Sequence, residues 1–339
     1  MEMFNSLKEI SSYTQAHQVL WNAQIELLTL CNFACQHCYI PNRTSKGLPL
    51  LVIKDLATAF FNMGTFNITL TGGEPLLRDD IFEIIEEFRN KGLRVKLYSN
   101  ASLLDRDKCI RLKELGISQF STTIFSLNPQ INDCITCKND SLNFILPNIA
   151  LLEELCVPVQ IKMPILKMNY ESYEELKTFC GAHNYSFFPS PNISPKTDGD
   201  SSPLKFELAE REFAKMIRKI DAEHTKNVTG DQNAFRKEDI ICHSLNNSVF
   251  INSIGDVFPC ISWPVKLGNI FEKSIAEIWN TSDVLQYLRS LKKSHMKFCG
   301  KCEYSTHCTV CPGDSMMDGD MLGCSHLQKK CAKAIMGLI

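Results

Sequence analysis

The sequence lacks any segment that would carry the chain into or across a membrane. Residues 1–9 contain no basic stretch that leads into an apolar run, so we predict no secretory signal peptide. No run of about 18 apolar residues occurs, so we predict no transmembrane helix. The net charge is only −2, and no basic field favours nucleic acid or an anionic membrane surface. We therefore expect a cytoplasmic protein with no nucleic-acid partner and no membrane partner.

Cysteine, in contrast, is abundant, with 16 among 339 residues. In a chain of this size without a signal peptide, many cysteines indicate metal ligation in a reducing compartment rather than disulfides. Three of them lie within residues 31–38, and eight lie between residues 242 and 331. The remaining five are scattered: Cys109, Cys134, Cys137, Cys156 and Cys180. We therefore look for metal centres near both ends of the chain.

An alternation of strand and helix patterns runs from residue 24 to about residue 190. The predicted strands are 24–30, 67–71, 93–98, 120–126, 157–165 and 185–188. The predicted helices are 51–63, 79–90, 106–115, 141–155 and 173–182. Strands joined by crossover helices form a parallel sheet, and six such units suit a partial (β/α)6 barrel. We predict an α/β protein with a barrel domain over 1–235, its core at 24–190, and a cysteine-rich domain over 236–339.

The loop after the first predicted strand carries three thiols, Cys31, Cys35 and Cys38, at the spacing C-x3-C-x2-C. Three thiolates on one short loop can converge on a single metal centre, but zinc and most ferredoxin-type clusters take four protein ligands. The next cysteine is Cys109, so a cube-type iron–sulfur cluster on this loop would keep one iron open. The alternative is half of a zinc site that His37 completes.

A second motif, Gly72-Gly73-Glu74-Pro75, ends the next predicted strand. Zinc binding would not explain this turn. The two motifs together resemble the signature of the radical S-adenosylmethionine (SAM) superfamily. This resemblance implies a [4Fe–4S] cluster on Cys31, Cys35 and Cys38, which binds SAM through its open iron. It also implies that the residues of this turn, including the Glu74 side chain, hold the SAM amino group.

The same resemblance assigns further residues to SAM. His37 is expected to pack near the adenine, and Tyr39, at the end of the cysteine motif, is expected to help to bind the cofactor. Asn100 and Ser126, at the ends of the third and fourth predicted strands, are expected to contact the ribose or the carboxylate. Lys138 is expected to take the place of an arginine that binds the carboxylate in the family.

The cysteine-rich tail contains Cys242-x12-Gly255-x4-Cys260, then Cys299-x2-Cys302-x5-Cys308-x2-Cys311, then Cys324 and Cys331. It resembles the SPASM domain, which holds two auxiliary [4Fe–4S] clusters, although the family has three residues where Thr309-Val310 stand. We expect Gly255 to turn a hairpin between 248–251 and 257–260, and a pair of amphipathic helices within 270–291. The tail alone would equally suit two zinc ribbons.

The SPASM resemblance also implies a ligand set for each auxiliary cluster. Cys242, Cys260 and Cys311 are expected to hold the first. Cys299, Cys302 and Cys308 are expected to hold the second, with Cys331 favoured over Cys324 as the fourth ligand because its spacing from Cys311 is closer to that of the family. Cys324 would then complete the first cluster or be spare.

The scattered cysteines divide into two groups. Cys109, Cys156 and Cys180 lie in apolar helical patterns, and we expect them in the core. Cys134 and Cys137 are expected in a loop near the SAM pocket, where they are candidate hydrogen-atom donors of the kind that an epimerase needs.

The resemblance implies three [4Fe–4S] clusters, SAM, and a 5′-deoxyadenosyl radical that abstracts a hydrogen from unactivated carbon. The connector Ile193-Ser194-Pro195-Lys196-Thr197-Asp198-Gly199-Asp200 looks like one found in maturases of ribosomally synthesised peptides. We therefore expect an enzyme that forms a thioether or carbon–carbon crosslink on a precursor peptide. Its partners would be a flavodoxin or ferredoxin and, because residues 1–24 are too short for a peptide-binding domain, a separate leader-binding protein or the barrel mouth. The alternatives are a peptide epimerase, an anaerobic sulfatase-maturating enzyme, an iron–sulfur electron carrier and a zinc-binding scaffold.

Overall fold

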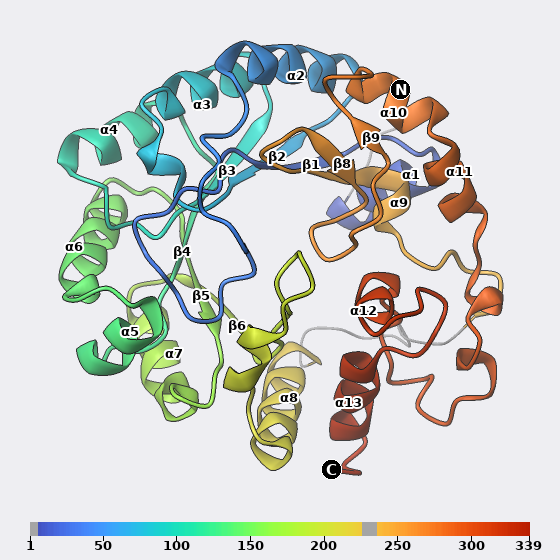
Figure 1. Cartoon of the computed structure of the whole chain (residues 1–339). Coiled ribbons are helices and arrows are strands. Elements are labelled where there is room, and N and C mark those ends of the chain that lie inside the picture. Colours follow the sequence, from blue (N-terminus) through green and yellow to red (C-terminus); the bar gives the residue numbers. More distant parts are fainter. Residues whose placement is uncertain (1–5, 226–235) are drawn as a thin grey trace.

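The structure is a computed structural model that describes residues 6–225 and 236–339. Its centre is an arc of six parallel strands with helices along the outer side (Figure 1). The strands are β1 (Asn22–Glu26), β2 (Asn67–Thr71), β3 (Arg94–Tyr98), β4 (Gln119–Thr123), β5 (Val159–Pro164) and β6 (Ser186–Ser190). They are hydrogen-bonded in chain order, each parallel to the next. The predicted partial barrel is confirmed.

Helices cover the outer side of the arc. In chain order, the helices of residues 6–225 are α1 (Leu7–Ala16), α2 (Leu50–Asn62), α3 (Ile81–Asn90), α4 (Arg106–Glu114), α5 (Pro129–Thr136), α6 (Ser141–Glu154), α7 (Tyr173–Ala182) and α8 (Glu210–Thr225). The first and the last of these pack against helices of the tail instead (Figure 1). Helix α5 is not among the predicted helices. Asn128 caps it by accepting from the backbone N–H groups of Gln130 and Ile131, and Pro129 opens it, which is a helix-start signal that the prediction missed.

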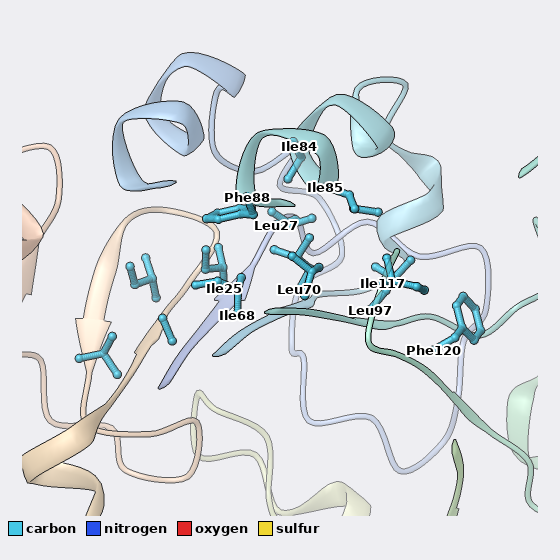
Figure 2. Packing of buried hydrophobic residues seen from close by; sticks show 14 of the residues in the cluster. Ile25, Leu27, Ile68, Leu70, Ile84, Ile85, Phe88, Leu97, Ile117 and Phe120 are labelled. Carbon is cyan, nitrogen blue, oxygen red and sulfur yellow. The ribbon is translucent and has the colours of Figure 1, made fainter. Parts of the chain in front are cut away.

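The core lies between the strands and these helices. Alternate strand residues face the helices, as period-two side-chain alternation requires. Figure 2 shows Ile25, Ile68 and Leu70 directed towards Ile85 and Phe88 of α3. The intervening residues face the concave side of the arc, where the sequence is mostly polar. The sheet therefore has an apolar outer face and a polar inner face.

The tail continues the same sheet. Strand β7 (Ser248–Ile251) pairs in parallel with β1, and β8 (Asp256–Phe258) and β9 (Gly268–Asn269) follow in antiparallel order. Gly255 turns the β7–β8 hairpin at φ +85°, as expected. The predicted domain boundary lies at the end of segment 226–235, outside the described residues. The division into two domains stays a prediction, because the hydrogen bonds of the sheet run across it.

The rest of the tail is helical. It contains α9 (Ser244–Asn247), α10 (Ile275–Thr281), α11 (Asp283–Ser290), α12 (Pro312–Met317) and α13 (His326–Ile335). Helices α10 and α11 are the expected pair within 270–291. Helix α13 packs on α8, where Arg218 donates to the carbonyl oxygens of Ala334 (3.0 Å) and Ile339 (2.8 Å). This contact closes the molecule on the side opposite β1 (Figure 1). Among the described helices, none has both the length and the apolar composition needed to cross a membrane.

Candidate active site at the carboxyl ends of the strands

The three-cysteine loop leaves the carboxyl end of β1 and is fixed from two sides. The end of α5 accepts hydrogen bonds from the loop, Ala34 N to Thr136 O (3.1 Å) and Gln36 N to Ile135 O (2.9 Å). From the other side, the Arg43 guanidinium donates to the carbonyl oxygens of Phe33 (3.0 Å) and Cys35 (3.3 Å). Arg43 is a site residue that the sequence analysis missed. No motif marks it, because its partners are carbonyl groups.

The thiols of the loop are close enough for the charge on one to shift the pKa of another. Burial, and to a smaller extent negative charge on Cys38 and Cys31, raises the pKa of the Cys35 thiol to about 12. The Arg43 guanidinium acts in the opposite direction and favours the thiolates. Three such thiols beside one fixed cation fit an anionic iron–sulfur cluster, whose ligands are thiolates. Within residues 6–225 and 236–339, no three His, Cys, Asp or Glu side chains are gathered closely enough to hold a single metal ion.

The Gly72-Gly73 turn lies directly against the backbone that enters the cysteine loop. Gly73 N donates to Leu28 O (2.9 Å), and Glu74 N donates to Leu30 O (2.8 Å). A Cβ on Gly73 would lie 2.1 Å from Leu30 O, and one on Gly72 would lie 2.4 Å from Leu28 O. The two glycines are therefore required by the close approach of the chain to itself.

The Glu74 side chain is fully buried and is hydrogen-bonded to the protein. Its Oε1 accepts from Leu76 N (2.9 Å) and Ser99 Oγ (2.8 Å), and its Oε2 accepts from Asn100 N (2.7 Å). The carboxylate thus connects the end of β2 to the end of β3. Binding of the SAM amino group by this side chain stays a prediction, and the three bonds assign it a structural role.

Asn100 lies next to the cysteine loop. Its amide nitrogen donates to Asn32 Oδ1 (2.8 Å) and is 4.0 Å from Cys31 Sγ. Its Oδ1 accepts from both the backbone N–H and the hydroxyl of Ser102 (2.9 and 2.7 Å). The structure therefore brings Asn100 to the predicted cofactor site, although its contact with SAM stays a prediction.

Ser126 and Lys138 are placed less favourably for SAM. Ser126 is buried beyond the end of β4, and its hydroxyl shares a hydrogen bond with Ser172 (2.8 Å) and accepts from Asn128 N (3.0 Å). Lys138 follows α5 and its side chain is exposed. Neither residue lines the large cavity described below.

The location predicted for Cys134 and Cys137 is wrong in one respect. Cys134 lies within α5 and Cys137 is its C-cap, in the left-handed conformation at φ 51°, so neither belongs to an open loop. Both thiols are exposed, and Gln36 binds the Cys134 carbonyl oxygen (2.6 Å). Neither cysteine lines the large cavity. This placement does not favour hydrogen donation to a substrate, which stays an untested prediction.

Two of the three cysteines expected in the core are there. Cys109 and Cys180 are buried, whereas Cys156 is exposed just after α6 with φ 55°. The prediction for Cys156 is wrong because helix α6 ends at Glu154, two residues before it.

His37 and Tyr39 line a cavity of about 1030 Å³. Its walls come from the cysteine loop, the ends of β5 and β6, the connector at 192–201 and the tail. Burial, together with the charge on Arg43, lowers the pKa of His37 to about 4, so the imidazole is neutral at pH 7. Its buried Nδ1 has no hydrogen-bond partner among the described residues. The His37 ring on the cavity wall is therefore neutral at pH 7, as packing against an adenine requires.

The tail cysteines form two groups. Cys242, Cys260 and Cys311 make up the first, since charge on Cys242 raises the pKa of Cys260, and charge on Cys260 raises that of Cys311, in both cases after the larger effect of burial. This grouping agrees with the ligands predicted for the first auxiliary cluster.

The second group joins Cys299, Cys302 and Cys308 to Cys324. After burial, charge on Cys324 and Cys302 is what raises the pKa of Cys299. Lys297 N donates to Leu322 O (2.9 Å), and this bond brings the chain before Cys324 back beside Cys299. Cys331 lies in α13 with its Sγ 3.8 Å from Asn192 Oδ1 of the connector. That backbone bond brings Cys324 to the group and favours it as the fourth ligand. Charge on Cys331 also raises the pKa of Cys308, although it is the smallest of the causes, so the choice between the two cysteines stays a prediction.

Comparison with known families identifies both halves. Residues 25–181 match the model of the radical SAM superfamily, and residues 242–303 match that of the SPASM iron–sulfur cluster-binding domain. The chain belongs to the radical SAM superfamily and carries a C-terminal SPASM domain. As a radical SAM enzyme it uses SAM and a [4Fe–4S] cluster, and its SPASM region holds auxiliary clusters. Cys308, Cys311, Cys324 and Cys331 lie beyond the matched SPASM residues.

The relatives of this radical SAM protein differ in function. It is 28% identical over 314 residues to an AdoMet-dependent heme synthase of Methanosarcina barkeri, covering 84% of this chain and 89% of that one. It is 25% identical over 316 residues to the subtilosin biosynthesis protein AlbA of Bacillus subtilis, covering 86% and 66%. The crystal structure of Streptococcus suis SuiB bound to precursor peptide SuiA has a TM-score of 0.74 at 17% identity, covering 98% and 84%. This last likeness establishes the fold only.

We predict that Gly73→Ala disrupts the turn beside the cysteine loop. The new Cβ would overlap two backbone oxygens, so the backbone must shift and the free energy of unfolding should fall by about 3 kcal/mol. Gly181→Ala is the matched control, because α7 has open space there and alanine should stabilise it by about 0.5–1 kcal/mol. Denaturant unfolding gives the free energy of unfolding of both variants. Equal values for Gly73→Ala and Gly181→Ala would contradict the prediction.

We predict a pH-dependent stability from Glu74. Burial raises its pKa from 4.5 to about 7, so the folded chain binds the proton more tightly than the unfolded chain. The stability that the folded chain gains from this tighter proton binding is complete below pH 4.5, and it is lost as the pH rises through about 7. Relative to Glu74→Gln, the wild type should therefore lose unfolding free energy across that window. Above it, the variant should still be less stable by about 1–3 kcal/mol, because the amide nitrogen that replaces Oε2 cannot accept from Asn100 N. A difference in unfolding free energy between the wild type and Glu74→Gln that does not change with pH would refute the prediction.

We predict that Cys324, rather than Cys331, is the fourth ligand of the second auxiliary cluster. Cys324→Ser should lower the iron content of anaerobically purified protein by about four atoms per chain. Cys331→Ser should keep that iron. Loss of iron in Cys331→Ser but not in Cys324→Ser would instead support Cys331 as the fourth ligand.

Proposed function

We propose that this radical SAM enzyme modifies a ribosomally synthesised peptide, and that the peptide binds in the cavity between the barrel mouth and the tail. The observation that carries the proposal is the composition of the cavity wall. His37 and Tyr39 come from the cysteine loop, and Ile261 and Ser262 directly follow Cys260 of the first auxiliary group. A ligand in this space touches both redox regions at once, as an oxidative crosslinking reaction requires.

The connector supports a peptide ligand. Thr197 N donates to Tyr39 O (3.0 Å), which fixes the connector to the cysteine loop. Lys196 forms a salt bridge with Asp200 and a backbone bond with the same residue, so the segment has a defined shape on the cavity wall. The volume of about 1030 Å³ is at the upper end for small-molecule pockets, and it accommodates several residues of an extended peptide.

Different residues of the chain would hold the clusters that the reaction needs. SAM and a reduced cluster together supply hydrogen abstraction from unactivated carbon. Cys31, Cys35 and Cys38 would hold that cluster, while Arg43 and the end of α5 keep the loop in place. The tail groups, led by Cys242 and Cys299, would hold two further clusters that accept the electron left on the substrate. A cytoplasmic location would supply the flavodoxin or ferredoxin that such an enzyme needs.

A second candidate substrate is an iron tetrapyrrole. The observation that favours it is the match to the heme synthase of Methanosarcina barkeri, which covers most of both chains at higher identity than the match to AlbA. The two proposals share the cofactors and differ in the ligand of the cavity.

We predict that the anaerobically purified protein contains about 12 iron atoms per chain and releases 5′-deoxyadenosine when dithionite and SAM are added. Short peptides encoded beside the gene and iron coproporphyrin III are then offered separately. Loss of two hydrogens from a peptide, seen by mass spectrometry, supports the proposal. Turnover of the tetrapyrrole alone would refute it. Zinc instead of iron would remove the enzymatic role altogether. The control is Cys31→Ala, which should abolish SAM cleavage.

A further inference from the structure

Two lysines lie on the concave face of the sheet. Val95 and Leu97 of β3 are buried in the helix-covered core, so Lys96 and Tyr98 face the opposite side. On β5, Ile161 and Met163 are buried in the same core, so Lys162 faces the concave side as well. All three concave residues are partly buried.

Lys162 has an aromatic neighbour and a cationic neighbour. Its Nζ lies 3.1 Å from the centroid of the Tyr98 ring. Burial, and to a smaller extent the positive charge on Lys96, lowers the pKa of its ammonium group to about 7. The pKa of Lys96 is itself lowered by burial and by Arg94. No carboxylate is among the groups that shift either lysine.

The surroundings of the two lysines supply no compensating negative charge. In the described part of the chain, neither Lys96 nor Lys162 has a salt bridge or a hydrogen bond to a carboxylate, whereas several other lysines, partly buried or exposed, have one. The neighbouring concave side chains are neutral: Gln119 donates to Ser121 (3.0 Å), which donates to Gln160 Oε1 (3.1 Å). Partly buried charges without a partner are costly, and a ligand that neutralises them recovers that cost.

Lys162 is close to the cavity in sequence and in sheet register, although neither lysine lines it. Pro164 lies two residues beyond Lys162 on the same face of β5 and lines the cavity. On the neighbouring strand β6, Phe188 pairs with Lys162, Ser190 pairs with Pro164, and both β6 residues line the cavity. The backbone of Lys162 therefore lies next to the cavity, and its ammonium group lies over the Tyr98 ring on the barrel side.

We propose that Lys96 and Lys162 form a binding site for a carboxylate group of the substrate. Tyr98 positions the Lys162 ammonium group through its ring, and the absence of acidic neighbours among the described residues leaves both cations available. The site rests on the proposed function only in taking the cavity as the substrate side of the molecule. It selects a substrate that carries a carboxylate, and it does not depend on which bond the enzyme forms.

The test compares glutarate with its neutral diamide, glutaramide, on the anaerobic holoenzyme by ligand-observed NMR. The wild type should bind glutarate about tenfold more tightly than glutaramide. Lys162→Met and Lys96→Met should each reduce this preference to about one. Lys162→Arg should retain it. The matched control is Lys54→Met, because Lys54 is exposed on α2 and pairs with Glu83, and it should retain the full preference.

Three results would overturn the proposal: no preference in the wild type, a preference that survives in both methionine variants, or competition between SAM and glutarate with a matching loss of SAM affinity in those variants. The last would mean that the lysines bind the SAM carboxylate.

Each methionine variant removes a partly buried, unpaired charge, so its Tm should not fall, and either variant alone suffices if the other does not fold. Binding is measured without turnover. A protein that prefers glutarate but modifies no peptide would therefore refute the proposed function and leave this site standing.

Discussion

The close approach between residues 28–30 and the Gly72-Gly73 turn is the constraint on which the active site depends. The backbone leaving β1 passes so near the turn after β2 that no Cβ fits between them. Two backbone hydrogen bonds, Gly73 N to Leu28 O and Glu74 N to Leu30 O, secure this contact. The cysteine loop begins at the next residue, Cys31. The position of the thiols therefore follows from the packing of two strand ends, rather than from any bond to a ligand.

Buried polar groups extend this constraint across the neighbouring strand ends. Glu74 accepts from the backbone of Leu76 and Asn100 and from the Ser99 hydroxyl, which joins β2 to β3. Asn100 then reaches Asn32 within the cysteine loop. Each of these groups has its partners inside the protein, as buried polar groups require. The site is consequently preformed, and His37 Nδ1 is the buried polar atom of the cysteine loop that is left without a partner in the described structure.

The sequence predicted most of the fold because the information is local. Period-two and period-3.6 patterns identified all six barrel strands, and Gly255 identified the tail hairpin. Strand ends were less accurate: the predicted first strand ran to residue 30, but Leu27 makes the last bond to β2, and Thr29 and Leu30 bond to the loop at Ser45 instead. Contacts between distant segments were not accessible in this way. The placement of Cys324 depends on the bond between Lys297 and Leu322, and the roles of Arg43 and Lys162 depend on tertiary neighbours that no motif encodes.

The parallel pairing of β1 with β7 has a mechanical consequence. Because the tail hairpin is hydrogen-bonded to the strand that leads into the cysteine loop, a displacement of the tail relative to the barrel would have to break the ladder from Asn22 to Ile25. The separation between the first thiol group and Cys260, which follows β8, is thus set by a rigid sheet. Electrons that pass between these regions would cross a fixed gap, and their transfer rate would be independent of any docking motion within the chain.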